Sequence, residues 1–218
     1  MDAITYQQFS LHRKPELLKQ LITAYQDVFS TSPWFEWKAC KYDNLKWGRE
    51  QENEIPDLKC PKCGKELTDF WPSDVVERDL HKELSLPNAT CWLALAEGKV
   101  IGFCWGYSLT LVELEAKLGT ACADAFHVSF NGTPRVAYQD EIGVIAPYRG
   151  RHIASKLFQL RLQDFLTQGL TVGTVRTKTL PPSVTYLWFN RLGYQTIANY
   201  NDPDGRVVMA TDIRALGK

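Results

Sequence analysis

The chain has 218 residues, which is enough for one well-buried domain or for one domain with a sizeable insertion, whereas two full domains would be cramped. Its 25 Lys and Arg residues balance its 25 Asp and Glu residues, so no overall field favours nucleic acid or an anionic membrane. The N-terminal residues lack the basic and apolar regions of a signal peptide, and no later stretch reaches transmembrane length. We therefore expect a cytoplasmic protein without a membrane partner.

The first third of the chain predicts a strand, a helix and an insertion. Residues 3–11 indicate an edge strand, and residues 15–29 a helix with one apolar stripe. Between Trp34 and Pro72 the periodicity disappears, while tryptophan, lysine and glutamate accumulate around Cys60-Pro61-Lys62-Cys63. Because structureless loops of this length are rare inside compact domains, we expect a metal to hold residues 34–72 together as an inserted subdomain.

The remaining segments alternate between strands and helices. Ser73 is expected to cap a helix that ends before Pro87. The pattern after it predicts a hairpin over 91–96 and 100–109, a short helix over 111–118 and an irregular loop over 119–134 that borders the substrate site. A strand over 136–145, a helix from Ile153, a strand over 170–177, a helix over 181–192 and a hairpin over 194–213 follow. This order predicts an α+β or mixed α/β fold.

The junction from Ile145 to Ala154 is the most informative stretch of the sequence. A strand leads into a basic turn, and the turn opens a helix whose first backbone N–H groups and dipole attract an anion. Gly150 lets a ligand approach the backbone, and Arg149 and Arg151 add positive charge. We interpret the turn as a pyrophosphate site; the alternative is a surface turn with two solvated arginines.

This stretch resembles the acetyl-CoA motif of the GCN5-related N-acetyltransferase (GNAT) superfamily. The residues that match the motif in register are Ile145, Pro147, Arg149, Gly150, Ile153 and Ala154. His152 departs from it, because the family usually has a second glycine there. The resemblance covers residues 89–213 well, the first strand and helices more loosely, and the insertion not at all.

The resemblance implies a single GNAT domain over residues 1–218, with a central, mostly antiparallel twisted sheet and flanking helices. It implies acetyl-CoA as co-substrate and an amine as acceptor. The pantetheine arm would meet the backbone of Val144, Ile145 and Ala146, and the remaining cofactor residues would be Arg149, Gly150, Arg151, His152, Ile153, Ala154 and Phe189.

Two catalytic residues are expected. Asp140 and Glu141 point to opposite faces of the strand that enters the motif, and Glu141 resembles the family's general base; the alternative is a solvent-facing acid. The family's usual tyrosine, which protonates the departing thiolate, is replaced by Phe189. Tyr186, one helical turn earlier, is the candidate acid, with water as the alternative.

Cysteine spacing predicts a structural zinc site. Cys60 and Cys63 form a zinc-knuckle sequence, and Cys40 with Asp43 supplies a second pair, for which His81 is a rival fourth ligand. An empty remnant of a zinc ribbon and a redox pair are the alternatives. Trp34, Trp37, Trp47 and Trp71 would pack the insertion onto its host, although lining an acceptor pocket and stacking on nucleobases remain alternatives.

The sequence therefore predicts an N-acetyltransferase that works by direct attack in a ternary complex, since no cysteine adjoins the motif to form a covalent intermediate. The rival hypothesis is a catalytically weak CoA-binding module whose insertion recruits a protein or nucleic acid. Neutral net charge argues against the nucleic-acid version. The acceptor and the oligomeric state are not encoded in any motif that we recognise.

Overall fold

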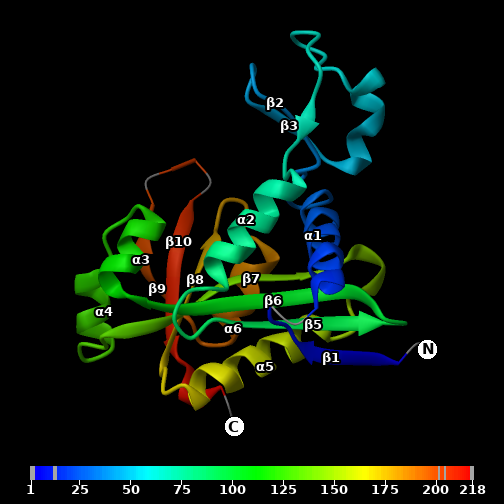
Figure 1. The fold of residues 1–218 in the computed structure, drawn as a ribbon. Coiled ribbons are helices and arrows are strands. Elements are labelled where there is room, and N and C mark those ends of the chain that lie inside the picture. Colours follow the sequence, from blue (N-terminus) through cyan, green and yellow to red (C-terminus); the bar gives the residue numbers. More distant parts are fainter. Residues whose placement is uncertain (1–2, 12–13, 201, 204, 217–218) are drawn as a thin grey trace. The chain divides into compact units, whose positions relative to one another are not determined.

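The computed structural model describes residues 3–11, 14–200, 202–203 and 205–216 (Figure 1). Its helices and strands are β1 (Ile4–Gln8), α1 (Pro15–Phe29), β2 (Lys38–Cys40), β3 (Leu45–Trp47), β4 (Thr68–Asp69), α2 (Ser73–Glu83), β5 (Thr90–Ala96), β6 (Lys99–Thr110), α3 (Leu111–Leu118), α4 (Ala123–Ser129), β7 (Arg135–Val144), α5 (Ile153–Thr167), β8 (Val172–Lys178), α6 (Val184–Arg191), β9 (Gln195–Asn199) and β10 (Arg206–Asp212). Within these ranges no helix combines the length and the apolar character needed to cross a membrane.

A seven-stranded sheet forms the centre of the fold, in the order β1-β5-β6-β7-β8-β10-β9. β7 and β8 pair in parallel, whereas β10 pairs antiparallel with both β8 and β9. β1 lies at one edge, as its sequence predicts. A second, three-stranded sheet has the order β3-β2-β4 and is antiparallel throughout. The predicted class, a mixed α/β fold with a mostly antiparallel central sheet and a small cysteine-containing insertion, is confirmed.

The chain divides into two compact units, each assembled from separate segments. The first unit comprises residues 1–82, 93–103 and 143–154, and the second comprises residues 83–92, 104–142 and 155–218. The first unit thus carries α1, the small sheet and the predicted pyrophosphate loop. The second carries the predicted catalytic residues.

Packing in the first unit centres on α1. Pro15 starts the helix with a backbone angle that suits its first turn, and the apolar stripe predicted from the sequence is buried. The Tyr25 ring lies 5.9 Å from the ring of Phe103, and Gln20 Oε1 accepts a hydrogen bond from the backbone N–H of Val100 at 3.0 Å. These contacts hold the start of β6 to the helix.

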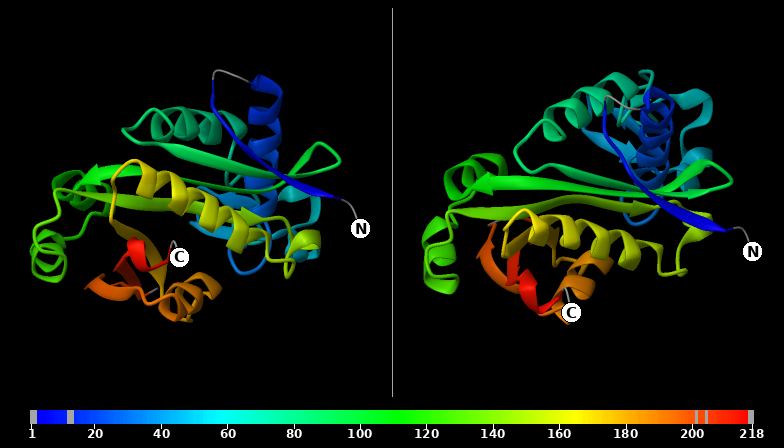
Figure 2. Two further views of the ribbon diagram at one scale, coloured as in Figure 1. Left: turned by 90° about the horizontal axis from the view of Figure 1, so that it is seen from below. Right: turned by 60° about the horizontal axis from the view of Figure 1, so that its bottom comes forward.

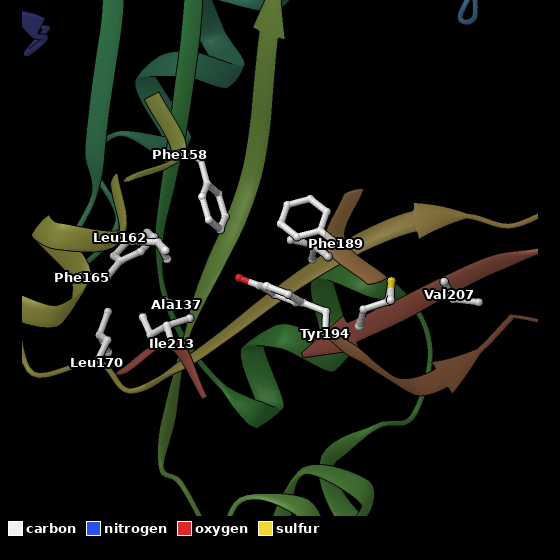
Figure 3. Packing of buried hydrophobic residues seen from close by; sticks show 11 residues of the cluster. Ala137, Phe158, Leu162, Phe165, Leu170, Phe189, Tyr194, Val207 and Ile213 are labelled. Carbon is white, nitrogen blue, oxygen red and sulfur yellow. The ribbon is translucent and has the colours of Figure 1, made fainter. Parts of the chain in front are cut away.

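Packing in the second unit centres on one face of α5. Phe158, Leu162 and Phe165 recur at helical spacing and are buried. They pack with β7, β8, β10 and α6 in a single apolar cluster, which includes Phe189 and Tyr194 (Figure 3). Figure 2 shows α5 and α6 on the same side of the strands. The cluster fixes where α6 lies relative to β8.

Three sequence predictions need correction. The loop expected over residues 119–134 contains α4, whose first N–H groups are satisfied by Glu115 Oε1, which accepts from Cys122 and Ala123 at 2.7 Å each. Ser73 is the first residue of α2 rather than its cap. The helix predicted from residue 181 begins later, because Ser183 is the true N-cap of α6 and accepts from the N–H of Tyr186 at 3.0 Å.

Candidate active site and metal centre

The predicted pyrophosphate loop joins β7 to α5 within the first unit. A short 3₁₀ turn over Ala146–Tyr148 follows β7, and α5 begins at Ile153. Gly150 has a φ of 76°, and a Cβ added there would meet no atom within 4 Å. Gly150 is therefore needed for its backbone conformation and leaves open space above the loop.

His152 adopts the same left-handed backbone region, with a φ of 59°. L-residues with a Cβ occupy this region at a cost, and glycine does so freely. The position where the family motif usually carries glycine is thus a position where the backbone itself favours glycine. The side chain of His152 is exposed.

Arg149 does not project freely from the loop. Its Nε donates to the carbonyl oxygen of Val144 at 3.0 Å, Nη1 donates to the carbonyl oxygen of Ser32 at 3.2 Å, and Nη2 donates to Thr31 Oγ1 at 3.3 Å. The guanidinium therefore ties the loop to the end of α1. Arg151 is exposed and lies with its guanidinium 5.0 Å from the centre of the Tyr148 ring.

The end of β7 presents one backbone edge away from β6. The N–H of Ile145 donates to the carbonyl oxygen of Ile101 in β6 at 3.0 Å. Since backbone groups alternate along a strand, the N–H and C=O of Val144 point to the opposite edge. The Val144 N–H is thus the best placed of the three predicted backbone groups to meet a pantetheine arm.

β7 and β8 separate after a short paired segment in the second unit. Their register joins Ala137 with Gly173 and Tyr138 with Thr174, although both strands continue for several residues. Diverging strands leave backbone donors and acceptors that an amide-bearing ligand can satisfy. The resemblance implies a splay at residues 144–146, which stays a prediction.

Asp140 and Glu141 have different surroundings. Asp140 Oδ2 accepts from the Tyr107 hydroxyl at 2.5 Å and from Lys117 Nζ at 2.9 Å. Glu141 is half-buried. Burial raises the pKa of Glu141 well above its ordinary value, Asp140 and Glu83 add to the rise, and Arg176 and Lys117 oppose it. A carboxyl group with a raised pKa is suited to proton transfer near neutral pH.

Glu83, Lys117 and Tyr107 form a network of polar contacts with Asp140 that the sequence did not indicate. Lys117 Nζ lies 2.8 Å from Glu83 Oε1, and burial together with Asp140 raises the pKa of Glu83 to about 7 although Lys117 opposes the rise. Burial lowers the pKa of Lys117, but Asp140 and Glu83 more than offset this and hold it above its ordinary value. These residues stand on separate elements and share no motif.

The two aromatic residues of α6 differ in burial. Phe189 is only 1% exposed and packs its ring against those of Phe158, Trp188 and Tyr194, at centroid distances of 5.8, 5.3 and 4.7 Å (Figure 3). It serves the core of the second unit. Tyr186 is half-buried at the margin of the same cluster, so its hydroxyl is the more accessible of the two side-chain ends.

The insertion brings the four predicted metal ligands together. The ligand atoms of Cys40, Asp43, Cys60 and Cys63 all lie within 4.8 Å of one another. Cys40 Sγ is 3.5 Å from Cys63 Sγ, and Asp43 Oδ2 is 3.7 Å from Cys40 Sγ and 3.3 Å from Cys60 Sγ. His81, the rival ligand, is not a member of this group among the described residues.

Local structure explains how the insertion forms this group. Cys40 ends β2, and Cys60 begins a tight turn in which Gly64, with a φ of 71°, donates its N–H to the Cys60 carbonyl oxygen at 2.8 Å. Lys62 Nζ contacts Asp43 Oδ1 at 3.3 Å, which leaves Oδ2 facing the sulfurs. Hydrogen bonds from the thiols lower the pKa of Asp43, and Asp43 raises the pKa of Cys63 to about 12.

The four tryptophans of the insertion pack, which was the favoured interpretation. Trp47 belongs to the small apolar cluster of the insertion, and the half-buried Trp37 packs against it. Trp34 lies 5.5 Å from the Phe29 ring, and Trp71 lies 5.5 Å from the Tyr25 ring. The insertion and α1 therefore share an aromatic contact within the first unit.

Comparison with known proteins gives the family. The model of the acetyltransferase (GNAT) family matches residues 60–180, more than half of the chain. The protein belongs to this family and is a GNAT-type acyltransferase. The match begins at Cys60, so it includes the last part of the insertion, which we had expected to lie wholly outside the resemblance. A comparison with curated proteins gives no match.

Solved structures support the same fold. The chain is similar to PaiA N-acetyltransferase of Thermoplasma acidophilum in complex with coenzyme A (TM-score 0.55, 12% identity, 96% of this chain and 99% of that one). It is similar to Ard1 of Thermoplasma volcanium (TM-score 0.54, 14% identity, 96% of this chain and 97% of that one). It is also similar to a polyamine N-acetyltransferase of Drosophila melanogaster that forms N-acetylagmatine (TM-score 0.53, 15% identity, 96% of this chain and 100% of that one). At these identities the likeness concerns the fold alone.

Proposed function

We propose that the protein transfers an acetyl group from acetyl-CoA to an amine by direct attack in a ternary complex. The observation that carries this proposal is the loop between β7 and α5, where Gly150 and His152 both adopt left-handed conformations directly before a helix begins. Such a loop directs backbone N–H groups at a pyrophosphate. The similar Thermoplasma acidophilum enzyme was solved with coenzyme A, and the similar Drosophila enzyme acts on polyamines.

In this proposal the residues divide the work as follows. Backbone groups of Val144, Ile145 and Ala146 bind the pantetheine arm, and residues 149–154 bind the pyrophosphate, with Phe189 supporting the cofactor from the core. Arg149 acts as an anchor for the loop, because each of its three guanidinium nitrogens donates a hydrogen bond, to Val144, Ser32 and Thr31 respectively. Arg151 supplies exposed positive charge, and the side chain of His152 is exposed beside it.

The reaction itself moves protons at the acceptor nitrogen and at the sulfur. Glu141 takes one proton from the acceptor ammonium, and the neutral amine then attacks the thioester carbonyl carbon. A carbon–nitrogen bond forms, the carbon–sulfur bond breaks, and the Val144 N–H stabilises the developing oxyanion. Tyr186 gives a proton to the departing CoA thiolate and regains one, through water, from the attacking nitrogen as the amide forms, and Glu141 returns its proton to solvent.

One observation favours a second candidate. Phe189 occupies the position of the family's usual acid and is buried in the core, so it neither donates a proton nor leaves room for a tyrosine hydroxyl without repacking. This favours a CoA-binding module with weak catalysis, whose insertion recruits a partner. The two functions differ in turnover and not in cofactor binding.

A paired assay separates the two candidates. Release of free CoA thiol is followed with acetyl-CoA and a panel that contains a monoamine, a diamine, an aminoglycoside and a lysine peptide. CoA binding is measured beside it by thermal shift. Turnover of any amine above the hydrolytic background supports the enzyme, binding without turnover supports the module, and the lack of both contradicts both proposals.

We further propose that the insertion, residues 34–72, is a zinc-ribbon-like subdomain of a single GNAT domain. A tetrahedral zinc with Zn–S bonds of about 2.3 Å and Zn–O bonds of about 2.1 Å places two sulfurs about 3.8 Å apart and a sulfur and an oxygen about 3.6 Å apart. Three of the six separations between the ligand atoms are 3.3 to 3.7 Å and fit such a site, and all six lie within 4.8 Å. When bound, zinc would cross-link the two halves of the ribbon.

The donor set also fits the small core of the insertion. Its buried apolar cluster contains only Cys40, Trp47, Ile55, Cys60 and Leu67, and two of these five residues are proposed ligands. A bound metal would stabilise a core of this size. Metal analysis of protein purified without added zinc tests the proposal: about one equivalent supports it, and less than about half an equivalent contradicts it.

A further inference from the structure

A partly buried ion cluster in the second unit includes Asp140, the residue directly before the proposed base. We call it the Lys117 cluster, and it consists of Glu83, Lys117 and Asp140. Lys117 Nζ, from α3, lies 2.8 Å from Glu83 Oε1 at the end of α2 and 2.9 Å from Asp140 Oδ2 in β7. One ammonium group therefore joins three elements that are far apart in the sequence.

Neutral donors and aromatic rings complete the surroundings of the cluster. Trp105 Nε1 donates to Glu83 Oε2 at 2.9 Å, and the Tyr107 hydroxyl donates to Asp140 Oδ2 at 2.5 Å. Lys117 Nζ also lies 5.3 Å and 5.5 Å from the ring centres of Tyr107 and Tyr138. Each member of the cluster is thus held in place by a further contact from β6 or β7.

The cluster differs from an ordinary surface ion pair. The side chains of Lys117, Glu83 and Asp140 are 29%, 17% and 7% exposed. Charges shielded from solvent in this way influence one another more strongly than exposed charges do. Two carboxylates share one ammonium, so the cluster carries an excess negative charge when both are ionised.

Glu141 follows Asp140 directly in β7, and this places it under the influence of the cluster. Arg176 of β8 and Tyr138 of β7 also interact with Glu141 electrostatically, while Arg161 of α5 donates through Nη1 to the backbone carbonyl of Glu141 at 2.8 Å. Asp140 and Glu83 disfavour the ionised form of Glu141, and Lys117 and Arg176 favour it. The balance depends on which members of the cluster are charged.

We propose that Lys117 and Glu83 are positioning residues for acetyl transfer, which hold Asp140 and set the electrostatic field in which Glu141 accepts the proton of the acceptor. This inference rests on the proposed function, in which Glu141 is the base. Neither residue touches the reacting atoms in this scheme. Their effect on the reaction passes through Asp140 and Glu141.

The two residues act with opposite sign. Replacement of Lys117 with Met removes a positive charge, so the ionised form of Glu141 becomes less favourable and its pKa rises. Replacement of Glu83 with Gln removes a negative charge, so the pKa of Glu141 falls. Since the base works only when ionised, the acid limb of the pH–rate profile moves to higher pH in Lys117→Met and to lower pH in Glu83→Gln.

The experiment measures the pH dependence of kcat/KM for the best amine of the panel. Lys117→Met moves the acid limb upward by about one pH unit, and Glu83→Gln moves it downward by a similar amount. The double variant lies close to the wild type, and Lys117→Arg, which keeps the charge, restores most of the wild-type profile. Lys82→Met and Glu77→Gln are matched controls on exposed positions of α2, and they leave the limb unmoved.

The outcomes distinguish this inference from the proposed function. If Glu141→Gln keeps the acid limb of the wild type, Glu141 is not the base, and the inference falls with that assignment. If the limb depends on Glu141 but the Lys117 and Glu83 variants do not shift it in opposite directions, the inference is wrong while the proposed function stands. A wild type without turnover on any amine contradicts the function on which the inference rests.

A second measurement does not depend on activity. The carboxyl carbons of the free protein are titrated by ¹³C NMR, with Glu141 assigned by its loss in Glu141→Gln. The pKa of Glu141 rises in Lys117→Met and falls in Glu83→Gln, and an unchanged value in both overturns the inference. If Lys117→Met does not fold, Lys117→Arg and Glu83→Gln still test it, since only Glu83→Gln shifts the titration.

Discussion

Replacement of His152 separates backbone strain from side-chain function in the cofactor loop. His152 has a φ of 59°, in the left-handed region, and its side chain is exposed. A residue with a Cβ costs about 1 kcal/mol or more in this region, whereas glycine costs nothing there but loses about 0.4–1 kcal/mol through the entropy of the unfolded chain. These terms nearly cancel, so His152→Gly keeps the wild-type free energy of unfolding to within about 0.5 kcal/mol.

His152→Val gives the contrast. A β-branched residue in the left-handed region is a severe outlier, and it lowers the free energy of unfolding by about 1–2 kcal/mol relative to His152→Gly. For a chain of this length that difference corresponds to about 2–8 °C in Tm. Denaturant and thermal unfolding of the three proteins measure it. Equal stability of the Gly and Val variants would refute the argument that the backbone at residue 152 favours glycine.

Two further predictions concern the zinc site of the insertion and Tyr186 as the proposed general acid. Removal of zinc by a strong chelator lowers the Tm, because a metal that binds only the folded ribbon adds its binding free energy to folding. Cys60→Ala loses both the metal and the chelator effect on the Tm, whereas Cys122→Ala keeps both. A wild type whose Tm does not respond to the chelator argues for an empty ribbon. Tyr186→Phe lowers kcat by about 10²-fold with little change in the KM for acetyl-CoA, as expected of a group that acts on the departing thiolate. An unchanged kcat assigns that protonation to water.

Elements with strong local signals were predicted well. The helix expected over residues 15–29 is α1, and the helix expected over 111–118 is α3, because an apolar stripe and clear end signals are encoded within each segment. α4 was missed because seven residues with a single buried apolar side chain, Phe126, produce no recognisable period. Its stability comes from Glu115, which lies outside the helix.

The metal ligands and the Lys117 cluster differ in how far the sequence predicts them. The spacing of Cys60 and Cys63 predicts a tight turn with two ligands, so their proximity to Cys40 and Asp43 was predictable without knowledge of the small sheet. Lys117 and Glu83 belong to no motif, and their ion pair joins positions that are far apart in the sequence. The anchoring of Arg149 to Thr31 and Ser32 was equally invisible, because its partners are more than a hundred positions away.

The most direct test of the account is the affinity of CoA for Gly150→Ala. The added Cβ meets no protein atom within 4 Å, so a loss of affinity reports a ligand close to the loop, together with the strain of a φ of 76°. Gly169→Ala is the matched control, because it has a φ of 79°, equally open surroundings, and a place at the other end of α5. Isothermal titration of CoA should give at least about a tenfold weaker Kd for Gly150→Ala, which is about 1.4 kcal/mol, and an unchanged Kd for Gly169→Ala. Equal CoA affinity in both variants and the wild type would contradict the assignment of residues 145–154 as the pyrophosphate site.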